Sequence, residues 1–375
     1  MYGGWIAVRN KIIGGLYRQA LKRIFFLRDP EKAHDSMTAM GEWLGRFWLT
    51  RLKTHFLFFY SHPALEQNIL GLKFANPIGL AAGFDKDARL TQILPEVGFG
   101  FEEIGSITGE PCAGNSGQRL WRLPRSRSLV VYYGLKNDGA EKIAVKLTKL
   151  KFKFPLGVSV AKTNCAATAE TDAGVADYVK ALNHFVVAGV GDYYTVNISC
   201  PNAFGGQPFT DAGRLEKLMT VIDAAPTIKP IFLKLSPDLS CAEVDEIITV
   251  ARRHRVDGFI CSNLTKKLDN QNILDKNIPD RGGLSGKIVE PLAEKLIKYI
   301  YRVTGGKYII IACGGVFTAA DAYRKIRLGA SLIQLITGMI YEGPQVIGEI
   351  NRGLVKLLAR DGFQNISRAV GVDNK

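Results

Sequence analysis

Eight short apolar runs, most of them separated by helical patterns, constrain this chain more than any other feature. Each run is rich in β-branched and aromatic residues and is bounded by turn residues, which is the pattern of a buried strand. The runs cover residues 77–82, 101–106, 156–162, 193–199, 230–236, 258–263, 308–315 and 331–337. Helical patterns between them include residues 140–150, 177–187, 241–254, 289–304 and 319–328. Eight βα repeats close most economically into a parallel barrel, so we predict the α/β class and a (β/α)8 TIM barrel.

One insertion is too long for a plain connection. Residues 110–135 separate the second and third strands and carry Leu120-Trp121-Arg122-Leu123. We expect this segment to form a hairpin over one mouth of the barrel.

Length and composition agree with one large catalytic domain and an appendage. With 375 residues, of which 47% are hydrophobic, the chain can bury a core of roughly 300 residues, and single barrels need about 250 or more. We divide it into an N-terminal extension (1–62), the barrel domain (63–360) and a C-terminal tail (361–375). The six cysteines are far apart and only five histidines exist, so we expect neither disulfides nor a metal site and take a reducing compartment as the default.

Polar residues end several of the predicted strands. In a TIM barrel the carboxyl ends of the strands meet at one mouth, where chemistry takes place. The residues at these ends are Lys86, Lys162, Asn197, Cys200, Lys234 and Asn263. The last two strands end in Gly314-Gly315 and Thr337-Gly338, whose backbone N–H groups are placed to bind a phosphate.

The segment 197–202 puts the Cys200 thiol between the carboxamides of Asn197 and Asn202, at the point where the apolar run 193–196 stops. A potential base flanked by hydrogen-bonding amides fits proton abstraction from a small polar ring. In the alternative interpretation the two amides cap loop backbone and the cysteine is a small buried hydrophobe.

The first 60 residues differ from the rest. Apolar residues from Trp5 to Phe25 recur at helical spacing among basic ones, and a second helical stretch follows over residues 29–48. This segment contains ten Lys and Arg residues but only four Asp and Glu residues, and the whole chain has a formal net charge of +14. We expect an interfacial membrane platform, the alternative being an ordinary helical cap on the barrel. No run approaches the ~18 apolar residues that span a bilayer, signal-peptide features are missing, and no nucleic-acid motif is present.

Six motifs resemble one enzyme family, dihydroorotate dehydrogenase, over about residues 66–350. They are Phe84-Asp85-Lys86-Asp87, Ile104-Gly105-Ser106-Ile107-Thr108, Arg119-Leu120-Trp121-Arg122-Leu123-Pro124, the segment 197–202, Gly282-Gly283-Leu284-Ser285-Gly286 and Gly329-Ala330-Ser331-Leu332-Ile333-Gln334-Leu335. Asp29-Pro30-Glu31-Lys32-Ala33-His34 resembles the helical extension of the membrane-associated, quinone-dependent class 2, which binds quinone between its helices.

The resemblance implies FMN-dependent oxidation of (S)-dihydroorotate to orotate in de novo pyrimidine (UMP) biosynthesis, with quinone as electron acceptor. Cys200 would remove the C5 proton while a hydride passes from C6 to N5 of FMN, and Lys234 would stabilise the reduced flavin. The implied substrate contacts are Lys86, Asn197, Asn202 and Asn263. The implied FMN contacts are Ala82, Gly83, Lys86, Ser106, Ser159, Asn197, Lys234, Ser262, Gly286, Gly314, Gly315, Thr337 and Gly338.

Several positions depart from the family pattern. The quinone-dependent class uses Ser at the position of Cys200 and Thr at the position of Ala203. A cysteine at the first position is what the soluble class 1 uses. A thiol ionises far more readily than a hydroxyl, so Cys200 would need no neighbouring hydroxyl. Val131 and Leu264 replace an Asn and a Thr that contact substrate, and Ser159 replaces an Asn that touches the flavin. Losing two hydrogen bonds, at roughly 0.5–1.5 kcal/mol each, would weaken binding about 5- to 150-fold unless Tyr132 or Lys136 compensates.

These departures leave alternatives open. One is a related FMN oxidoreductase that acts on a different reduced pyrimidine or uses fumarate or NAD as acceptor. Another is a flavin-binding membrane scaffold without turnover. We expect a peripheral protein on the cytoplasmic face of the cell membrane, the bacterial inner membrane, as a monomer or a homodimer.

Overall fold

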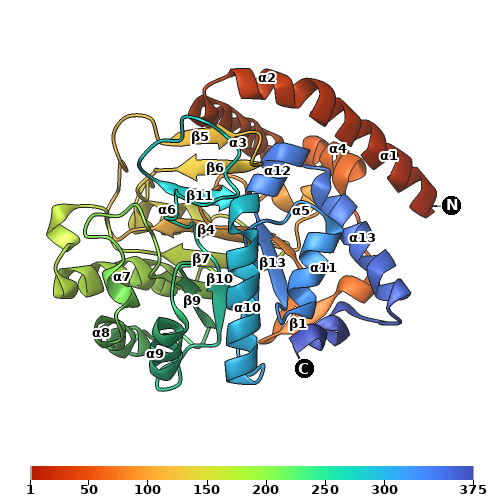
Figure 1. Ribbon diagram of the computed structural model, residues 1–375. Coiled ribbons are helices and arrows are strands. Elements are labelled where there is room, and N and C mark those ends of the chain that lie inside the picture. The colour runs from red at the N-terminus through yellow and green to blue at the C-terminus, as the bar shows by residue number, and fades with distance from the viewer. Residues whose placement is uncertain (1, 375) are drawn as a thin grey trace.

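The centre of the molecule is a closed barrel of eight parallel strands, seen in a computed structural model that describes residues 2–374, with side chains from residue 5 onward (Figure 1). In barrel order, the strands are β3 (Ile78–Leu80), β4 (Phe101–Ile107), β7 (Leu156–Val160), β8 (Tyr193–Asn197), β9 (Ile231–Leu235), β10 (Gly258–Cys261), β12 (Ile309–Cys313) and β13 (Leu332–Leu335). Each overlaps one of the eight predicted runs, so the barrel prediction is confirmed.

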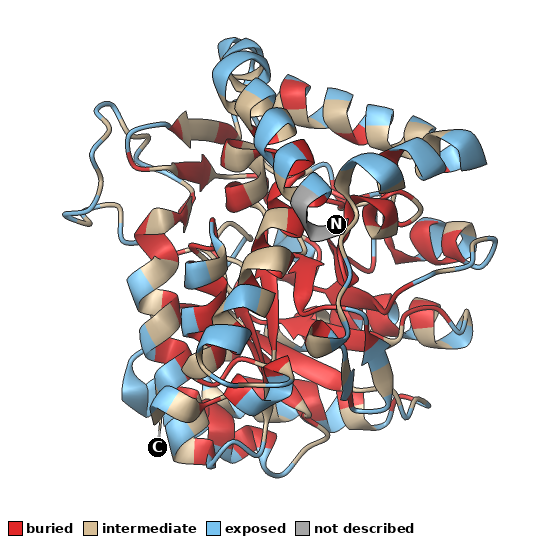
Figure 2. Cartoon of the chain, turned by 90° about the vertical axis from the view of Figure 1, so that its right-hand side faces the viewer, coloured by how far each residue is buried: buried red, intermediate tan, exposed pale blue. Residues whose placement is uncertain are grey.

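Helices surround the barrel, and Figure 2 shows the buried strands at the centre with exposed helix faces outside. They are α5 (Leu94–Val97), α6 (Ala140–Leu147), α7 (Thr171–Val187), α8 (Ala212–Asp223), α9 (Cys241–Ala251), α10 (Glu290–Thr304), α11 (Ala319–Arg327), α12 (Thr337–Glu342) and α13 (Val346–Arg360). The five predicted helices are present, although α7 begins at Thr171 instead of residue 177. Capping boxes start α9, at Ser240, and α11, at Thr318. Beyond α13, the tail buries Ile366 and Ala369 against the core.

The floor of the barrel is built from aromatic rings packed on glycines of neighbouring strands. Gly79 is the register partner of Phe101, and a Cβ at Gly79 would meet that ring at 2.4 Å. Gly157 is likewise the register partner of Tyr193, and a Cβ at Gly157 would meet the Tyr193 ring at 2.1 Å. The hairpin of β1 (Gln67–Ile69) and β2 (Leu72–Phe74) packs Ile69 and Phe74 against these rings and so closes this end of the barrel. Only glycine leaves room for the rings, so the lower barrel is fully packed and the open space lies at the other mouth.

A three-stranded antiparallel sheet lies over that other mouth. The predicted hairpin is present as β5 (Leu120–Leu123) and β6 (Ser128–Val131). Its third strand, β11 (Gly283–Gly286), comes from far along the chain and pairs with β6. This third strand was not predicted, because nothing in its local pattern specifies a distant partner.

Helices make up most of the N-terminal extension between residues 2 and 58. They are α1 (Tyr2–Leu16), a π-helical turn (Tyr17–Leu21), α2 (Lys22–Leu27), α3 (Pro30–Arg46) and α4 (Trp48–Phe58). Asp29 caps α3, its carboxylate accepting the N–H of Lys32 at 2.9 Å. The two predicted helical stretches are present, whereas α4 was not predicted.

Two arginines attach this extension to the hairpin over the barrel, and a third joins two helices within the extension. Arg119, directly before β5, binds Glu31 on α3 through two of its nitrogens. Arg122, on β5, donates to the carbonyls of Phe26 and Arg28 at 3.3 and 2.8 Å. Arg9 on α1 donates to the carbonyl oxygens of Phe56 and Phe59, at the C-terminus of α4. The extension is therefore fixed across the mouth of the barrel.

The outer surface of the extension is strongly apolar. On α1, the polar Arg9 and Asn10 face inward while Trp5, Val8 and Ile12 are 46%, 57% and 65% exposed. The other large apolar side chains exposed on the extension are Leu16, Leu21, Ile24, Leu27, Met40, Trp43, Phe47, Trp48, Leu49, Leu52, Phe56 and Leu57. Within residues 2–374, none of the helices combines the length and the apolar character required to cross a membrane.

The packing of Phe101 on Gly79 predicts a specific cost. Gly79→Ala should lower the free energy of unfolding by about 1–3 kcal/mol, because the added methyl overpacks a rigid ring. Urea unfolding measures the effect, and Gly15→Ala, whose new methyl would meet open space, is the control. Adding Phe101→Leu to Gly79→Ala should recover part of the loss; equal stability of both single variants would contradict the described packing.

Candidate active site

Two adjoining cavities open at the carboxyl ends of the strands. The larger, of about 920 Å³, extends from the barrel mouth to His34 on α3. The smaller, of about 520 Å³, lies against the last strands. Ala82, Lys234 and Thr337 line both cavities, so together they form one cleft.

Nearly all of the residues singled out from the sequence reach this cleft. Those on the larger cavity are Ala82, Gly83, Lys86, Ser106, Asn197, Cys200, Asn202, Lys234, Asn263 and Thr337. The others, on the smaller cavity, are Ser262, Gly286, Gly314, Gly315 and Gly338. Ser159 is buried and lies behind Ser106, with 2.7 Å between their hydroxyl oxygens.

The three asparagines are held by a network of hydrogen bonds. The Asn197 amide donates to the hydroxyl of Ser106 at 2.7 Å, and its carbonyl oxygen accepts from Asn263 at 3.2 Å. The Asn263 amide also donates to Ser199, while the Asn202 amide donates to the carbonyl of Val131 at 2.8 Å. These contacts fix the orientation of the side chains before any ligand binds.

Cys200 lines the larger cavity as a free, partly buried thiol. Burial raises the pKa of this thiol, and a backbone hydrogen bond at Asn202 and the ammonium groups of Lys162 and Lys234 only partly oppose the effect. The resting group at neutral pH is therefore the protonated thiol.

Lys234 stands between the two cavities beside a buried carboxylate. Its ammonium nitrogen lies 3.8 Å from Oε1 of Glu103, inside the barrel. Oε2 of Glu103 accepts hydrogen bonds from Thr195 at 3.1 Å and from Gln334 at 3.0 Å. Sequence reasoning missed Glu103, although an acidic residue within an apolar strand was a signal that could have revealed it.

Lys86 carries a second cation to the larger cavity. Its ammonium lies 3.9 Å from the centroid of the Tyr133 ring, a cation–π contact. Burial, and next the charge of Lys136, lower the pKa of Lys86 to about 8. Its protonation state is therefore easily changed by a ligand.

The glycine positions of the smaller cavity form a concave, donor-rich surface. Gly286 and Gly314-Gly315 have positive φ angles, and Gly338 lies in the first turn of α12, whose N–H groups lack intrahelical partners. The hydroxyls of Ser285 and Thr337 are 2.9 Å apart beside them. Such a surface can bind an anion such as phosphate.

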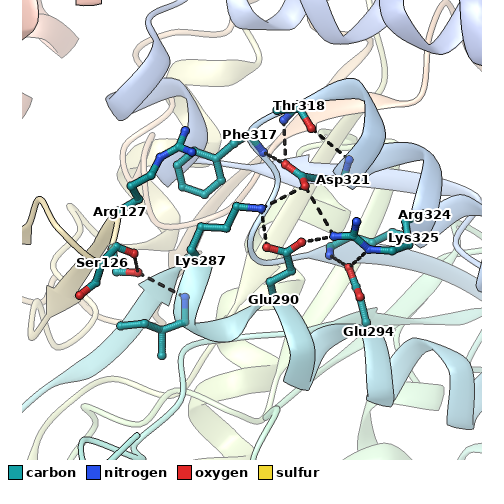
Figure 3. Close-up of polar contacts among 12 residues, drawn as sticks. Ser126, Arg127, Lys287, Glu290, Glu294, Phe317, Thr318, Asp321, Arg324 and Lys325 are labelled. Carbon is teal, nitrogen blue, oxygen red and sulfur yellow. Dashed lines mark hydrogen bonds and ion pairs between the residues drawn. The ribbon is translucent and has the colours of Figure 1, made fainter. Parts of the chain in front are cut away.

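A charged network supports two of the segments that carry these glycines, the end of β11 and the loop after β12 (Figure 3). The Asp321 carboxylate accepts the N–H groups of Phe317 and Thr318 at 3.0 and 2.9 Å. Lys287, next to Gly286, binds both Asp321, at 3.0 Å, and Glu290. The ends of β11, α10 and α11 are thereby held together, which keeps the glycine surface in shape.

Among residues 2–374, no group of three or more His, Cys, Asp or Glu side chains is arranged to hold a metal ion.

Comparison with known proteins places these features in a family. The family model described as dihydroorotate dehydrogenase matches residues 64–358. The dihydroorotate dehydrogenase (quinone) of Trichodesmium erythraeum is 35% identical over 382 residues, covering 96% of this chain and 99% of that protein. Its counterpart in Natronomonas pharaonis is 37% identical over 361 residues, with the same coverage of 96% and 99%. The crystal structure of Eimeria tenella DHODH in complex with ferulenol matches with a TM-score of 0.81 at 29% identity, covering 96% of this chain and 98% of that one.

The raised pKa of Cys200 is open to direct measurement. The rate at which iodoacetamide alkylates Cys200, followed by peptide mass spectrometry across pH, should reach half its maximum above the ordinary thiol range, because only the thiolate reacts. The urea-unfolded protein is the control and should show an ordinary midpoint. A folded-state midpoint at or below the unfolded one would contradict the assignment.

Proposed function

Because the chain belongs to the dihydroorotate dehydrogenase family, we propose that it oxidises dihydroorotate to orotate in pyrimidine biosynthesis and passes the electrons to a quinone. The protein is an oxidoreductase. The observation that carries the proposal is one cleft in which Cys200, Asn197 and Lys234 meet beside a glycine-lined anion surface.

FMN is the cofactor that we propose. When bound, FMN supplies the acceptor for the hydride that leaves C6 of the substrate. The smaller cavity fits its phosphate, since Gly314, Gly315 and Gly338 present backbone to it without side chains. Lys234 would carry a positive charge at the junction of the two cavities, where the flavin and the substrate would meet. Ser159 would act through Ser106 rather than by direct contact.

Cys200 is the base that we propose for the C5 proton. Its thiolate would take that proton onto Sγ while the substrate becomes orotate. The ammonium groups of Lys162 and Lys234 favour the thiolate, although burial raises the thiol pKa. We place the substrate among Lys86, Asn197, Asn202 and Asn263, which face the same cavity.

Quinone as acceptor fits the outer part of the larger cavity. Toward the extension, this cavity is lined by the apolar side chains of Leu120, Leu129 and Ile340 as well as by His34. Burial, followed by the charges of Lys86 and Lys136, lowers the pKa of His34 well below its ordinary value, so its imidazole is neutral at neutral pH. An apolar passage with a neutral polar group suits a quinone ring.

Residues 1–62 form the membrane platform in this proposal. The exposed apolar side chains of α1, α3 and α4 are the part of the surface that would enter the lipid interface, and basic residues lie among them. A helical extension that lies on the membrane would bring the outer cavity to the quinone pool. The protein would then be peripheral to the membrane.

A related FMN oxidoreductase is the second candidate. Val131 and Leu264 put apolar surface in the larger cavity, where the family presents hydrogen-bonding side chains, which would favour a different reduced pyrimidine.

Flavin reduction tests the reaction. Anaerobic mixing with dihydroorotate should bleach the flavin absorbance of the purified holoenzyme, and Cys200→Ser should slow the bleaching by about 10²–10⁴-fold because the base is lost. Cys241→Ser, at an exposed cysteine on α9, is the matched control and should bleach at the wild-type rate. A yellow protein that binds FMN but is bleached only by another reduced pyrimidine would favour the second candidate.

Membrane binding tests the platform. The triple variant Trp5→Ser, Ile12→Ser and Phe56→Ser should lose at least about tenfold in affinity for vesicles containing anionic phospholipid, because it removes apolar surface from the interface. Its reduction of a soluble dye should be unchanged, while its rate with membrane-embedded quinone should fall. The control is Val187→Ser with Ile228→Ser, two exposed apolar residues on the barrel domain. If the wild type, the triple variant and the control variant bound vesicles equally, the proposed membrane platform would be contradicted.

A further inference from the structure

A second lysine shares the larger cavity with Lys86. Lys136 follows the β5–β6 hairpin and lines the cavity together with Lys86 and Cys200. Its ammonium nitrogen lies 3.7 Å from Oε1 of Glu31, which is on α3 of the extension. Lys136 thus stands at the border between the substrate region and the extension.

Each carboxamide NH₂ group of the cavity already makes a hydrogen bond within the protein, which leaves at most one N–H of each group for a ligand. The NH₂ group of Asn263 donates to Asn197 and to Ser199, and that of Asn202 donates to the backbone of Val131. The cavity also contains the side chains of Val131 and Leu264, which have no hydrogen-bonding groups. A ligand that carries a negative charge must therefore rely mainly on the lysine ammonium groups.

The two ammonium groups have different partners in the free protein. Lys86 lies over the face of the Tyr133 ring, which is a weak countercharge. Lys136 contacts Glu31 at a distance longer than a hydrogen bond, and Arg119 binds the same carboxylate more closely. Because Arg119 keeps Glu31 neutralised, Lys136 can leave this contact without exposing an unpaired buried charge.

From these contacts we propose that Lys136 is a specificity-determining residue that, together with Lys86, binds the carboxylate of the substrate. The proposal rests on the proposed function. Lys136 exchanges its loose contact with Glu31 for the substrate carboxylate, and its flexible four-carbon stem permits the movement. A carboxylate between two ammonium groups forms charge-assisted hydrogen bonds and relieves the repulsion between them. Lys136 thereby replaces donors that are missing at Val131 and Leu264.

The titration of Lys86 gives this arrangement a pH signature. The charged and titratable groups that surround Lys86 are Lys136, Asp87, Asp35, Asp85, His34 and Tyr133. Burial and Lys136 lower the pKa of Lys86 to about 8, so the ammonium is fully present below this pH and is lost above it. Affinity for a carboxylate should therefore decrease as the pH rises through about 8. Removing the charge of Lys136 raises the pKa of Lys86 and moves this decrease to higher pH.

The experiment compares charged and neutral ligands on the full-length holoenzyme. For Lys136→Met, the Kd of orotate by calorimetry and the KM of dihydroorotate should rise about tenfold or more, with kcat nearly unchanged. The methyl esters of both ligands should bind wild type and variant within about twofold of each other. Lys136→Arg should recover most of the affinity, and the pH at which orotate binding weakens should increase in Lys136→Met. Lys142→Met, at a lysine that is 73% exposed and pairs with Asp138, is the matched control.

The outcomes separate the two proposals. If wild type turns over dihydroorotate but Lys136→Met binds orotate as tightly as wild type, or weakens acid and ester equally, the role of Lys136 is wrong. If wild type neither binds orotate nor is reduced by dihydroorotate, the proposed function fails and the role of Lys136 fails with it.

Discussion

A single buried carboxylate, that of Glu103, joins four strands whose ends form the cleft. Glu103 is on β4, and its partners Thr195, Lys234 and Gln334 are on β8, β9 and β13. A buried charge is tolerated only when it is paired and hydrogen-bonded, and breaking such a pair costs about 3–5 kcal/mol. The strands must therefore keep the register that brings these groups together. The same register presents the ammonium of Lys234 at the floor of the cleft, where a cofactor and a substrate would meet.

Above the cleft, Glu31 has a comparable role at the border between two parts of the chain. Its carboxylate binds Arg119, directly before β5, and lies near Lys136, so the hairpin over the barrel mouth and helix α3 share one anion. Arg122, three residues further along the chain, donates to backbone carbonyls at the end of α2 and just beyond it. The roof of the cavity is therefore made by the extension and the hairpin together. This explains why one cavity reaches from Cys200 to His34.

Local patterns predicted much of this architecture, and tertiary contacts explain the rest. Strand runs are visible in sequence because both faces of a barrel strand are buried, and parallel closure then gathers residues such as Lys86 and Cys200 at one mouth. The pairing of β11 with β6 was not predictable, because it joins segments about 150 residues apart without a local signal. Nor was the position of Ser159 behind Ser106, since neighbouring strands decide which hydroxyl reaches the cleft. The outward direction of Trp5 and Ile12 depends on Arg9 binding the end of α4.

The state of Cys200 shows how such contacts alter the chemistry expected from a residue type. A thiol in water has a pKa of about 8.5, and burial raises the pKa of Cys200 further. Each added unit of pKa costs about 1.4 kcal/mol when the thiolate forms at neutral pH. The charges of Lys162 and Lys234 stabilise the thiolate and thereby offset part of the rise in the pKa. A serine hydroxyl in the same place would start from a far higher pKa and would need a hydroxyl neighbour, which Ala203 does not provide. Two cations and a thiol are therefore a consistent set: the lysines make the thiolate accessible, and the raised pKa makes that thiolate a stronger base for a carbon-bound proton.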